Sequence, residues 1–291
     1  MSGIFLEGYF TETNPALPGR AFSIKILEPV AAEETEHHLV EIFRGEGCGI
    51  VYALDGRIQT AQNDEFLYHE MFAHTAAFAH ESPENILVIG GGNGGIVREL
   101  LKHPCVEHID VCDLDGTLVE LCKKHLPGSR KALDNFKVDI SIMDGTRFIK
   151  NKHACYDIIL IEGQEHNGKD KKLSSKEFLA ECKVALKPGG VLAAKTGSHI
   201  LHMEIALRQA SIFRDLFRYS GYFSITVPSL SGGSTGICIG CDDHEVNRPA
   251  RLPFHRFVRS LKAYSSAMHK AAFILPPFWN KIAAKIETAA E

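Results

Sequence analysis

Short segments in which apolar and polar side chains alternate occupy the first fifth of the chain. They cover residues 22–26, 39–43 and 49–54, and the turn sequence Asp55-Gly56 follows the last of them. Alternation with a period of two is typical of half-buried β-strands, and an Asp-Gly pair is typical of the turn between two of them. We therefore predict a small antiparallel β domain over residues 1–62.

The pattern changes at Asp64, where apolar positions first follow helical spacing and continuous apolar runs then begin. The run Ile86–Ile89 suits a strand that is buried on both faces. Similar runs alternate with helix-like segments, at residues 108–113, 138–143, 156–162 and 191–195. Such alternation predicts an α/β fold with a parallel sheet and helices on both sides.

Two further β-like segments, residues 222–227 and 235–241, are separated by a Gly-Gly turn and can pair only as an antiparallel hairpin. A parallel sheet that ends in such a hairpin is typical of Rossmann-like, class I methyltransferase-type folds. We predict this nucleoside-binding domain over residues 63–245 and a helical C-terminal tail, interrupted by two prolines, over residues 246–291.

Composition and charge narrow the class of partner. Lys and Arg total 32 against 36 acidic residues, a net charge of -4, which lacks the basic excess of a nucleic-acid-binding protein. No run approaches the roughly 18 apolar residues of a membrane span, so we expect no membrane association. The eight cysteines are scattered through apolar runs and the first residues do not resemble a signal peptide. We expect a reduced, cytoplasmic protein.

A glycine-rich loop follows the first buried strand. Gly90, Gly92 and Gly95 have the GxGxxG spacing, and Asp113 ends the next strand. The loop alone is also compatible with a tight turn that binds no ligand. A carboxylate at the end of the second strand, however, can accept hydrogen bonds from both hydroxyls of a ribose. Together the loop and the acid indicate an adenosine-like ligand.

Asp144-Gly145 ends the third predicted strand and bears on which nucleoside binds. An acid at this place can accept a hydrogen bond from an adenine amino group, although Asp-Gly is also common turn chemistry. A dinucleotide-binding fold does not ordinarily need an acid there. With the terminal hairpin, these residues favour an S-adenosylmethionine-type nucleoside over a nicotinamide cofactor.

Several of these stretches resemble the spermidine synthase (polyamine aminopropyltransferase) family. The likeness lies in residues 54–59 with 64–71, 88–95, 112–115 and 269–276. The resemblance implies an N-terminal β domain, a Rossmann-like catalytic domain and a homodimer or homotetramer. It also implies transfer of an aminopropyl group from decarboxylated S-adenosylmethionine to a small-molecule amine, with release of methylthioadenosine.

The family's donor-binding positions are present. The resemblance implies that Gln59 and Asp113 hold the donor nucleoside, that Asp144 holds its adenine, and that Tyr68 and His69 line the space between donor and acceptor. The full predicted donor-binding set is Gln59, His69, Gly90, Gly92, Asn93, Gly95, Asp113, Asp144 and Gly145.

The acceptor half differs from the family pattern. The family has Asp where this chain has Asn93, and its Asp-Ser-Ser-Asp-Pro run appears here as the Glu-Gly-Gln-Glu-His of residues 162–166. The acceptor segment after the fifth strand has become residues 195–198, and the family's Tyr-Pro-Ser-Gly turn has become residues 230–233. The acceptor amine therefore cannot be named from the sequence.

Transfer of an alkyl group to an amine requires a neutral nitrogen. An alkylammonium with a pKa of about 10.4 loses its proton at pH 7 at a cost of roughly 4–5 kcal/mol, so a nearby carboxylate base is needed. Glu162 ends the fourth strand and is our candidate base, although a solvated strand-end acid would look the same. Glu165 is the candidate anchor for a second amine, and Tyr68 offers a ring face to an alkylamine.

Two other functions stay open at this stage. Because Asn93 is neutral, the donor can be intact S-adenosylmethionine, with transfer of a 3-amino-3-carboxypropyl or methyl group; Lys195 could then meet an anionic substrate. A catalytically silent nucleoside-binding homologue is the other alternative. Cys238, Cys241 and His244 have metal-type spacing but the strand pattern of core residues, so we expect no metal.

Overall fold

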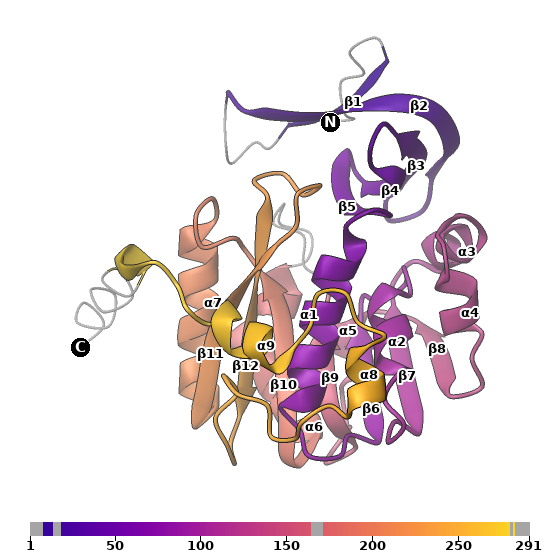
Figure 1. Cartoon of the computed structure of the whole chain (residues 1–291). Helices are drawn as coiled ribbons and strands as arrows, with labels where there is room; N and C mark the ends of the chain where they lie inside the picture. The colour runs from indigo at the N-terminus through magenta and orange to yellow at the C-terminus, as the bar shows by residue number, and fades with distance from the viewer. Residues whose placement is uncertain (1–7, 14–18, 164–170, 280–281, 283–291) are drawn as a thin grey trace.

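The computed structural model describes residues 8–13, 19–163, 171–279 and 282, and these residues form two sheets (Figure 1). The N-terminal sheet is an antiparallel meander with the order β1-β2-β3-β4-β5. Its strands are β1 (Tyr9–Thr13), β2 (Ala21–Glu34), β3 (Leu39–Gly45), β4 (Gly49–Leu54) and β5 (Arg57–Ala61). The predicted β domain is present, but β1 and β5 were not predicted. Their apolar residues do not alternate with polar ones: Tyr9 and Phe10 are adjacent in β1, and two polar residues separate Ile58 from Ala61 in β5.

The second sheet has seven strands in the order β11-β12-β10-β9-β6-β7-β8. They are β6 (Asn85–Ile89), β7 (His108–Asp113), β8 (Val138–Ile142), β9 (Tyr156–Ile161), β10 (Leu186–Thr196), β11 (Tyr219–Thr226) and β12 (Ser234–Cys241). The strands β8, β7, β6, β9 and β10 are parallel, and the β11–β12 hairpin joins antiparallel to β10. The prediction of a parallel sheet that ends in an antiparallel hairpin is confirmed.

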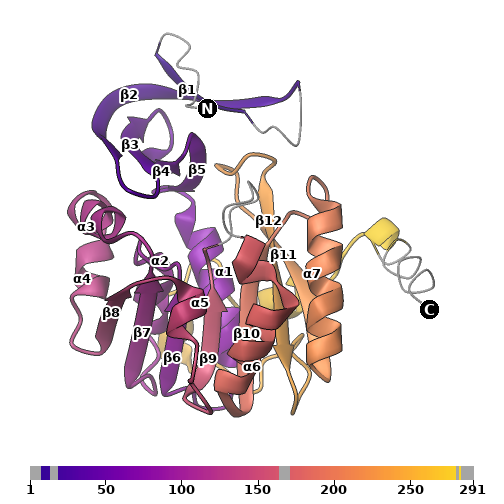
Figure 2. The same ribbon diagram turned by 180° about the vertical axis from the view of Figure 1, so that it is seen from behind.

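Helices cover both faces of this sheet (Figures 1 and 2). One face carries α1 (Glu65–Phe78), α2 (Gly95–Leu100), α4 (Ser129–Leu133), α8 (His255–Val258) and α9 (Ser266–Ala272). The other carries α5 (Gly145–Phe148), the 3-10 turn η1 (Lys171–Ser174), α6 (Lys176–Ala185) and α7 (Met203–Leu216). All six residues of β9 are buried, as a central strand between two helix layers requires. In the described ranges, no helix has the length and apolar character needed to cross a bilayer.

The remaining helix, α3 (Gly116–His125), joins the two sheets. Leu118 and Cys122 of α3 share a buried cluster with Val40, Ile42 and Tyr52 of the N-terminal sheet. This packing holds the N-terminal sheet over the carboxyl ends of β6 and β7, so residues of both sheets can line one site.

The segment after β12 packs back onto α1. The carboxylate of Glu70, only 2% exposed, accepts backbone N–H bonds from Lys262 at 3.0 Å, Ala263 at 2.7 Å and Tyr264 at 3.1 Å. Residues 68–78 of α1 are consequently buried on every side. Among the described residues of the predicted C-terminal tail, α8, α9 and residues 277–279 and 282 are helical, and the irregular backbone between α8 and α9 holds Glu70.

Candidate active site

A cavity of about 380 Å³ lies at the carboxyl ends of β6, β7 and β9, beneath the N-terminal sheet. Parallel α/β sheets bind ligands at this edge, where the strand order reverses. Most of the predicted site residues line the cavity: Gln59, Gly90, Gly92, Asn93, Asp113, Asp144, Gly145 and Glu162.

Asp113, at the end of β7, is held by the backbone around it. Its Oδ2 accepts the Gly92 N–H at 2.9 Å and its Oδ1 accepts the Asp115 N–H at 3.0 Å. Burial raises the pKa of Asp113 to about 6, against the opposing effect of these two hydrogen bonds. The carboxylate has one backbone partner on each oxygen, so each oxygen keeps a lone pair for a ligand hydroxyl.

Asp144 sits beyond the end of β8 and caps α5. Its Oδ1 accepts both the N–H and the hydroxyl of Thr146, at 2.8 and 2.7 Å. Burial acts to raise the pKa of Asp144, but the Thr146 bonds and the charges of Lys172 and Arg147 outweigh it and hold the pKa below its usual value. Among the described residues no hydrogen bond uses Oδ2. A ligand amino group can therefore bond to this oxygen.

Apolar side chains next to Asp113 and Asp144 also line the cavity, and the sequence analysis did not predict them. Leu114 follows Asp113 and Met143 precedes Asp144; both line the cavity, and they are 41% and 40% exposed. Flat apolar surfaces next to hydrogen-bonding carboxylates suit a purine ring. The sequence feature that could have predicted them is that each is an apolar residue next to a candidate acid at a strand end.

The N-terminal sheet also contributes lining residues that sequence analysis did not find. His37, His38 and Tyr52 face the same cavity, and His38 is fixed by a 3.1 Å bond between its Nδ1 and Asp55. Nothing in the local sequence marks the two histidines, because only the packing of α3 against this sheet brings them to the site.

Glu162 lies directly after β9 and is 7% exposed. Asn93 of the glycine loop donates from Nδ2 to Glu162 Oε1 at 3.2 Å and accepts the Gly95 N–H at 2.7 Å. Glu162 Oε2 is buried and has no hydrogen-bond partner among the described residues. One oxygen of the candidate base is therefore hydrogen-bonded to Asn93, and the other is available to accept a proton.

Tyr68 and His69 do not line this cavity, although His69 Nε2 lies 3.9 Å from Oε1 of the lining residue Glu162. The Tyr68 ring is 5.2 Å from the His69 ring, and Lys195 Nζ is 5.4 Å from the Tyr68 ring centroid. Burial and the neighbouring Glu162 carboxylate raise the pKa of the Tyr68 hydroxyl well above its usual value. The predicted acceptor anchor, Glu165, lies outside the described residues.

Packing within the protein requires glycine at two positions of the loop. Gly90 has φ +78°, and a Cβ there would lie 2.4 Å from the Gly163 nitrogen. A Cβ on Gly95 would lie 2.2 Å from Cε1 of His69. Gly95 does not line the large cavity; with His69 it lines a second cavity of about 40 Å³. The loop thus packs against His69 and also forms part of the wall of the large cavity.

The cysteines with metal-type spacing lie on opposite faces of the sheet. Cys238 belongs to the core on the α6–α7 side and Cys241 to the core on the α1 side. Cys241 Sγ is 3.6 Å from His244 Nδ1, but Cys238 points away from both. Alternate residues of a strand face opposite sides, so this pair cannot share an ion.

Comparisons with known proteins place the chain in a family. Residues 8–62 match the spermidine synthase tetramerisation domain and residues 65–249 match the spermine/spermidine synthase domain. Spermidine synthase of Dictyostelium discoideum is 32% identical over 275 residues, covering 94% of this chain and 97% of the relative. A polyamine aminopropyltransferase of Bacillus cereus is 33% identical over 273 residues, covering 94% and 98%.

Solved structures agree with the sequence comparison. Spermidine synthase from Thermotoga maritima superimposes with a TM-score of 0.86 at 26% identity, covering 96% of this chain and 95% of that one. A spermidine synthase in complex with the transition-state analogue AdoDATO gives a TM-score of 0.88 at 26% identity, covering 96% of both chains. On both the sequence and the structure, the chain belongs to the spermidine synthase family.

Proposed function

We propose that this protein is an aminopropyltransferase that moves the aminopropyl group of decarboxylated S-adenosylmethionine to an amine and releases methylthioadenosine. The observation that carries the proposal is the single cavity in which Asp113, Asp144 and Glu162 meet at successive strand ends. The named relatives are spermidine synthases and polyamine aminopropyltransferases. Their names support this function over a silent nucleoside-binding homologue.

The donor nucleoside fits the cavity in one orientation. Asp113 accepts the ribose hydroxyls, Asp144 accepts the adenine amino group, and Leu114 and Met143 cover the purine. Asp113 lies between Asp144 at the β8 end and Glu162 at the β9 end, because β7 and β6 separate β8 from β9. The sulfonium therefore points toward Glu162, which stabilises its charge.

Glu162 then acts as the general base. The ammonium of the acceptor gives a proton to Glu162 Oε2, and the free lone pair on nitrogen attacks the aminopropyl carbon. The C–S bond breaks with its electron pair remaining on sulfur, which neutralises the sulfonium. Asn93 holds the other carboxylate oxygen during this step. Fixed geometry matters here because misplacement by about 1 Å can cost on the order of 100-fold in rate.

The donor is the decarboxylated form in this proposal. An intact donor would bring its own carboxylate into a cavity that already contains Asp113 and Glu162. Asn93 moderates this repulsion because its amide, unlike the family's aspartate, adds no charge. We expect the wild type to bind decarboxylated S-adenosylmethionine more tightly than the intact form in isothermal titration.

Asn93→Asp tests the cause of that preference. The new carboxylate would lie against Glu162 Oε1 while its own oxygen can still accept the Gly95 N–H. We expect the affinity ratio between the two donors to widen by about tenfold, or ~1.4 kcal/mol. Methylthioadenosine, which lacks the aminopropyl arm, is the control and should bind both proteins similarly. Equal binding of the two donors to the wild type would contradict the assignment.

Binding of methylthioadenosine should depend on pH through Asp113. Because burial raises the pKa of this carboxyl to about 6, it is ionised above that pH and accepts both ribose hydroxyls. Below about pH 6 the ligand must displace a proton, so the Kd is expected to rise about tenfold for each further pH unit. Fluorescence or calorimetric titration from about pH 5 to about pH 8 measures it. A flat profile would contradict this role, and Asp113→Asn should bind weakly at every pH.

Product analysis tests the reaction itself. The protein is incubated with each donor and a panel of monoamines and diamines, and products are identified by mass spectrometry. We expect methylthioadenosine with the decarboxylated donor and an amine. S-adenosylhomocysteine from the intact donor would instead show methyl transfer, and no product with any pair would support a silent homologue.

The N-terminal sheet is the proposed site of assembly. Residues 8–62 match a tetramerisation domain, so we propose that the protein is a homotetramer assembled through this sheet. We propose residues 1–62 and 63–245 as its two main units and residues 246–291 as a C-terminal tail. The eight cysteines are free thiols in the structure, which supports a cytoplasmic location.

A further inference from the structure

The side chain of His69 lies between two carboxylates. It is 4% exposed; its Nδ1 is hydrogen-bonded to Oε2 of Glu65 one turn earlier on α1, and its Nε2 is 3.9 Å from Oε1 of Glu162. One carboxylate is our candidate base and the other has no part in the reaction described so far.

Glu65 is held as an anion. Arg98 of α2 donates from Nη2 to both oxygens of Glu65, at 2.9 and 2.7 Å. Burial acts to raise the pKa of Glu65, but the contacts with His69 and Arg98 outweigh it and lower the pKa to about 2. An ionised carboxylate only accepts hydrogen bonds, so Nδ1 of the ring must be the donor. In the neutral ring the lone pair is then on Nε2, the atom that faces Glu162.

Each of the two facing side chains has one buried atom without a partner in the described part of the chain, although Glu162 Oε1, the oxygen 3.9 Å from His69 Nε2, also accepts the Asn93 amide at 3.2 Å. Neither His69 Nε2 nor Glu162 Oε2 has a hydrogen-bond partner among the described residues, and both atoms are buried. Leaving buried polar atoms unpaired destabilises a fold, so such a pair needs another explanation. The absence of a Cβ on Gly95 is what allows the ring to lie there.

The pair also lies between the two cavities. Glu162 lines the donor cavity of about 380 Å³, and His69, Glu65 and Arg98 line the second cavity of about 40 Å³. Asn93 lines both. A proton that passes from Glu162 to His69 therefore leaves the cavity where the alkyl transfer takes place.

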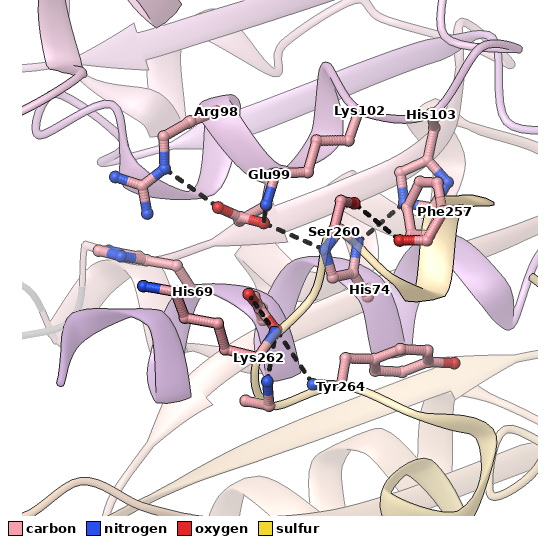
Figure 3. Close-up of polar contacts among 12 residues, drawn as sticks. His69, His74, Arg98, Glu99, Lys102, His103, Phe257, Ser260, Lys262 and Tyr264 are labelled. Carbon is pink, nitrogen blue, oxygen red and sulfur yellow. Dashed lines mark hydrogen bonds and ion pairs between the residues drawn. The ribbon is translucent and has the colours of Figure 1, made fainter. Parts of the chain in front are cut away.

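Charged groups around the His69 ring favour proton transfer from Glu162 to His69. Glu65 on α1 and Glu162 after β9 are its acidic neighbours, and Arg98 on α2 is bonded to Glu65. Arg98 is also bonded through Nε to Glu99, whose other partners are His74 and Lys102 (Figure 3). On β10, Lys195 lies over the ring of Tyr68. An imidazolium at His69 would thus sit between two anions, with the Arg98 charge shared by Glu65 and Glu99.

We propose that His69 is the second proton acceptor of the reaction and that Glu65 and Arg98 are its positioning residues. The proposal rests on the proposed function of Glu162. After the amine has given its proton to Glu162, the O–H bond on Glu162 breaks and the proton bonds to the Nε2 lone pair. The carboxylate of Glu162 is restored and His69 becomes an imidazolium that keeps its Nδ1–H bond to Glu65. The 3.9 Å separation is between Nε2 and Oε1, so the transfer requires a rotation of the carboxyl group that brings the protonated Oε2 to Nε2.

The pH profile of His69→Gln tests the proposal. Near pH 7 we expect kcat for methylthioadenosine release to fall on the order of 100-fold, with the KM for the donor unchanged because His69 does not line the donor cavity. The deficit should shrink as the pH rises past about 10.4, where the acceptor amine is mostly neutral. His153→Gln, at an exposed position, is the matched control and should keep wild-type activity. A deficit that is constant with pH would overturn the proposal.

A second measurement does not depend on activity. Nitrogen NMR of the histidine rings in the full-length protein should show His69 protonated on Nδ1 and not on Nε2, and Glu65→Gln should increase the Nε2–H form because the anion that fixes Nδ1–H is lost. An Nε2–H ring in the wild type, or no change in Glu65→Gln, would overturn the relay. If the wild type releases no methylthioadenosine, the proposed function fails, and the NMR result still decides the arrangement of His69.

Discussion

Glu162→Gln is expected to lower kcat by about 10³-fold and to leave binding of methylthioadenosine within about threefold of the wild type. The amide has nearly the same shape and its oxygen can still accept the Asn93 bond, but it cannot take a proton from the acceptor ammonium. The cost therefore falls on the chemical step. Single-turnover kinetics with the decarboxylated donor and calorimetry with methylthioadenosine measure the two effects separately.

Glu162→Asp is the matched variant for this prediction. It keeps the charge and restores the family's residue, but retracts the carboxylate by one methylene, about an ångström. A loss on the order of 100-fold is expected because the flanking residues are arranged for the longer side chain. If Glu162→Gln retained more than about a tenth of the wild-type kcat, Glu162 would not be the base.

The second large effect is expected at Asp113. Asp113→Ala should weaken binding of methylthioadenosine by about 10²–10⁴-fold, since two hydrogen bonds from ribose to a carboxylate contribute about 1.5–3 kcal/mol each. The same change leaves the N–H groups of Gly92 and Asp115 without their acceptor. Calorimetric titration at about pH 8, where the wild-type carboxyl is ionised, measures the loss.

The comparison ligand is adenine, which lacks the ribose. Its affinity should fall much less in Asp113→Ala, because Asp144, Leu114 and Met143 are unchanged. An equal loss for adenine and methylthioadenosine would mean that the variant distorts the whole pocket, and ribose recognition by Asp113 would then be unsupported. A thermal unfolding curve of the variant shows whether the fold has been retained.

The parts of the fold that depend on local pattern could be predicted from the sequence. The run Ile86–Ile89 is continuous because β6 is buried on both faces, and a parallel sheet with helices on both sides follows from alternating strands and helices. Gly90, Asp113 and Asp144 could be predicted as site residues because each lies at the carboxyl end of a strand, where the topology brings them together.

Other features depend on contacts between distant segments. His37 and His38 reach the cavity only because α3 packs on the N-terminal sheet. Tyr68 and His69 were expected to line the space between donor and acceptor, and the absence of a Cβ on Gly95 lets the His69 ring lie against the loop, where it lines the smaller cavity. Asn93 donates a hydrogen bond to Glu162 and accepts one from the Gly95 N–H. These two bonds likewise depend on tertiary geometry that no sequence motif contains.

The orientation of the donor nucleoside is the central claim, and a crystal structure with methylthioadenosine tests it most directly. We predict both ribose hydroxyls within about 3 Å of the Asp113 carboxylate, the adenine amino group bonded to Asp144, and the sulfur at the Glu162 end of the cavity. A nucleoside bound with its adenine against Glu162, or bound outside this cavity, would contradict the account.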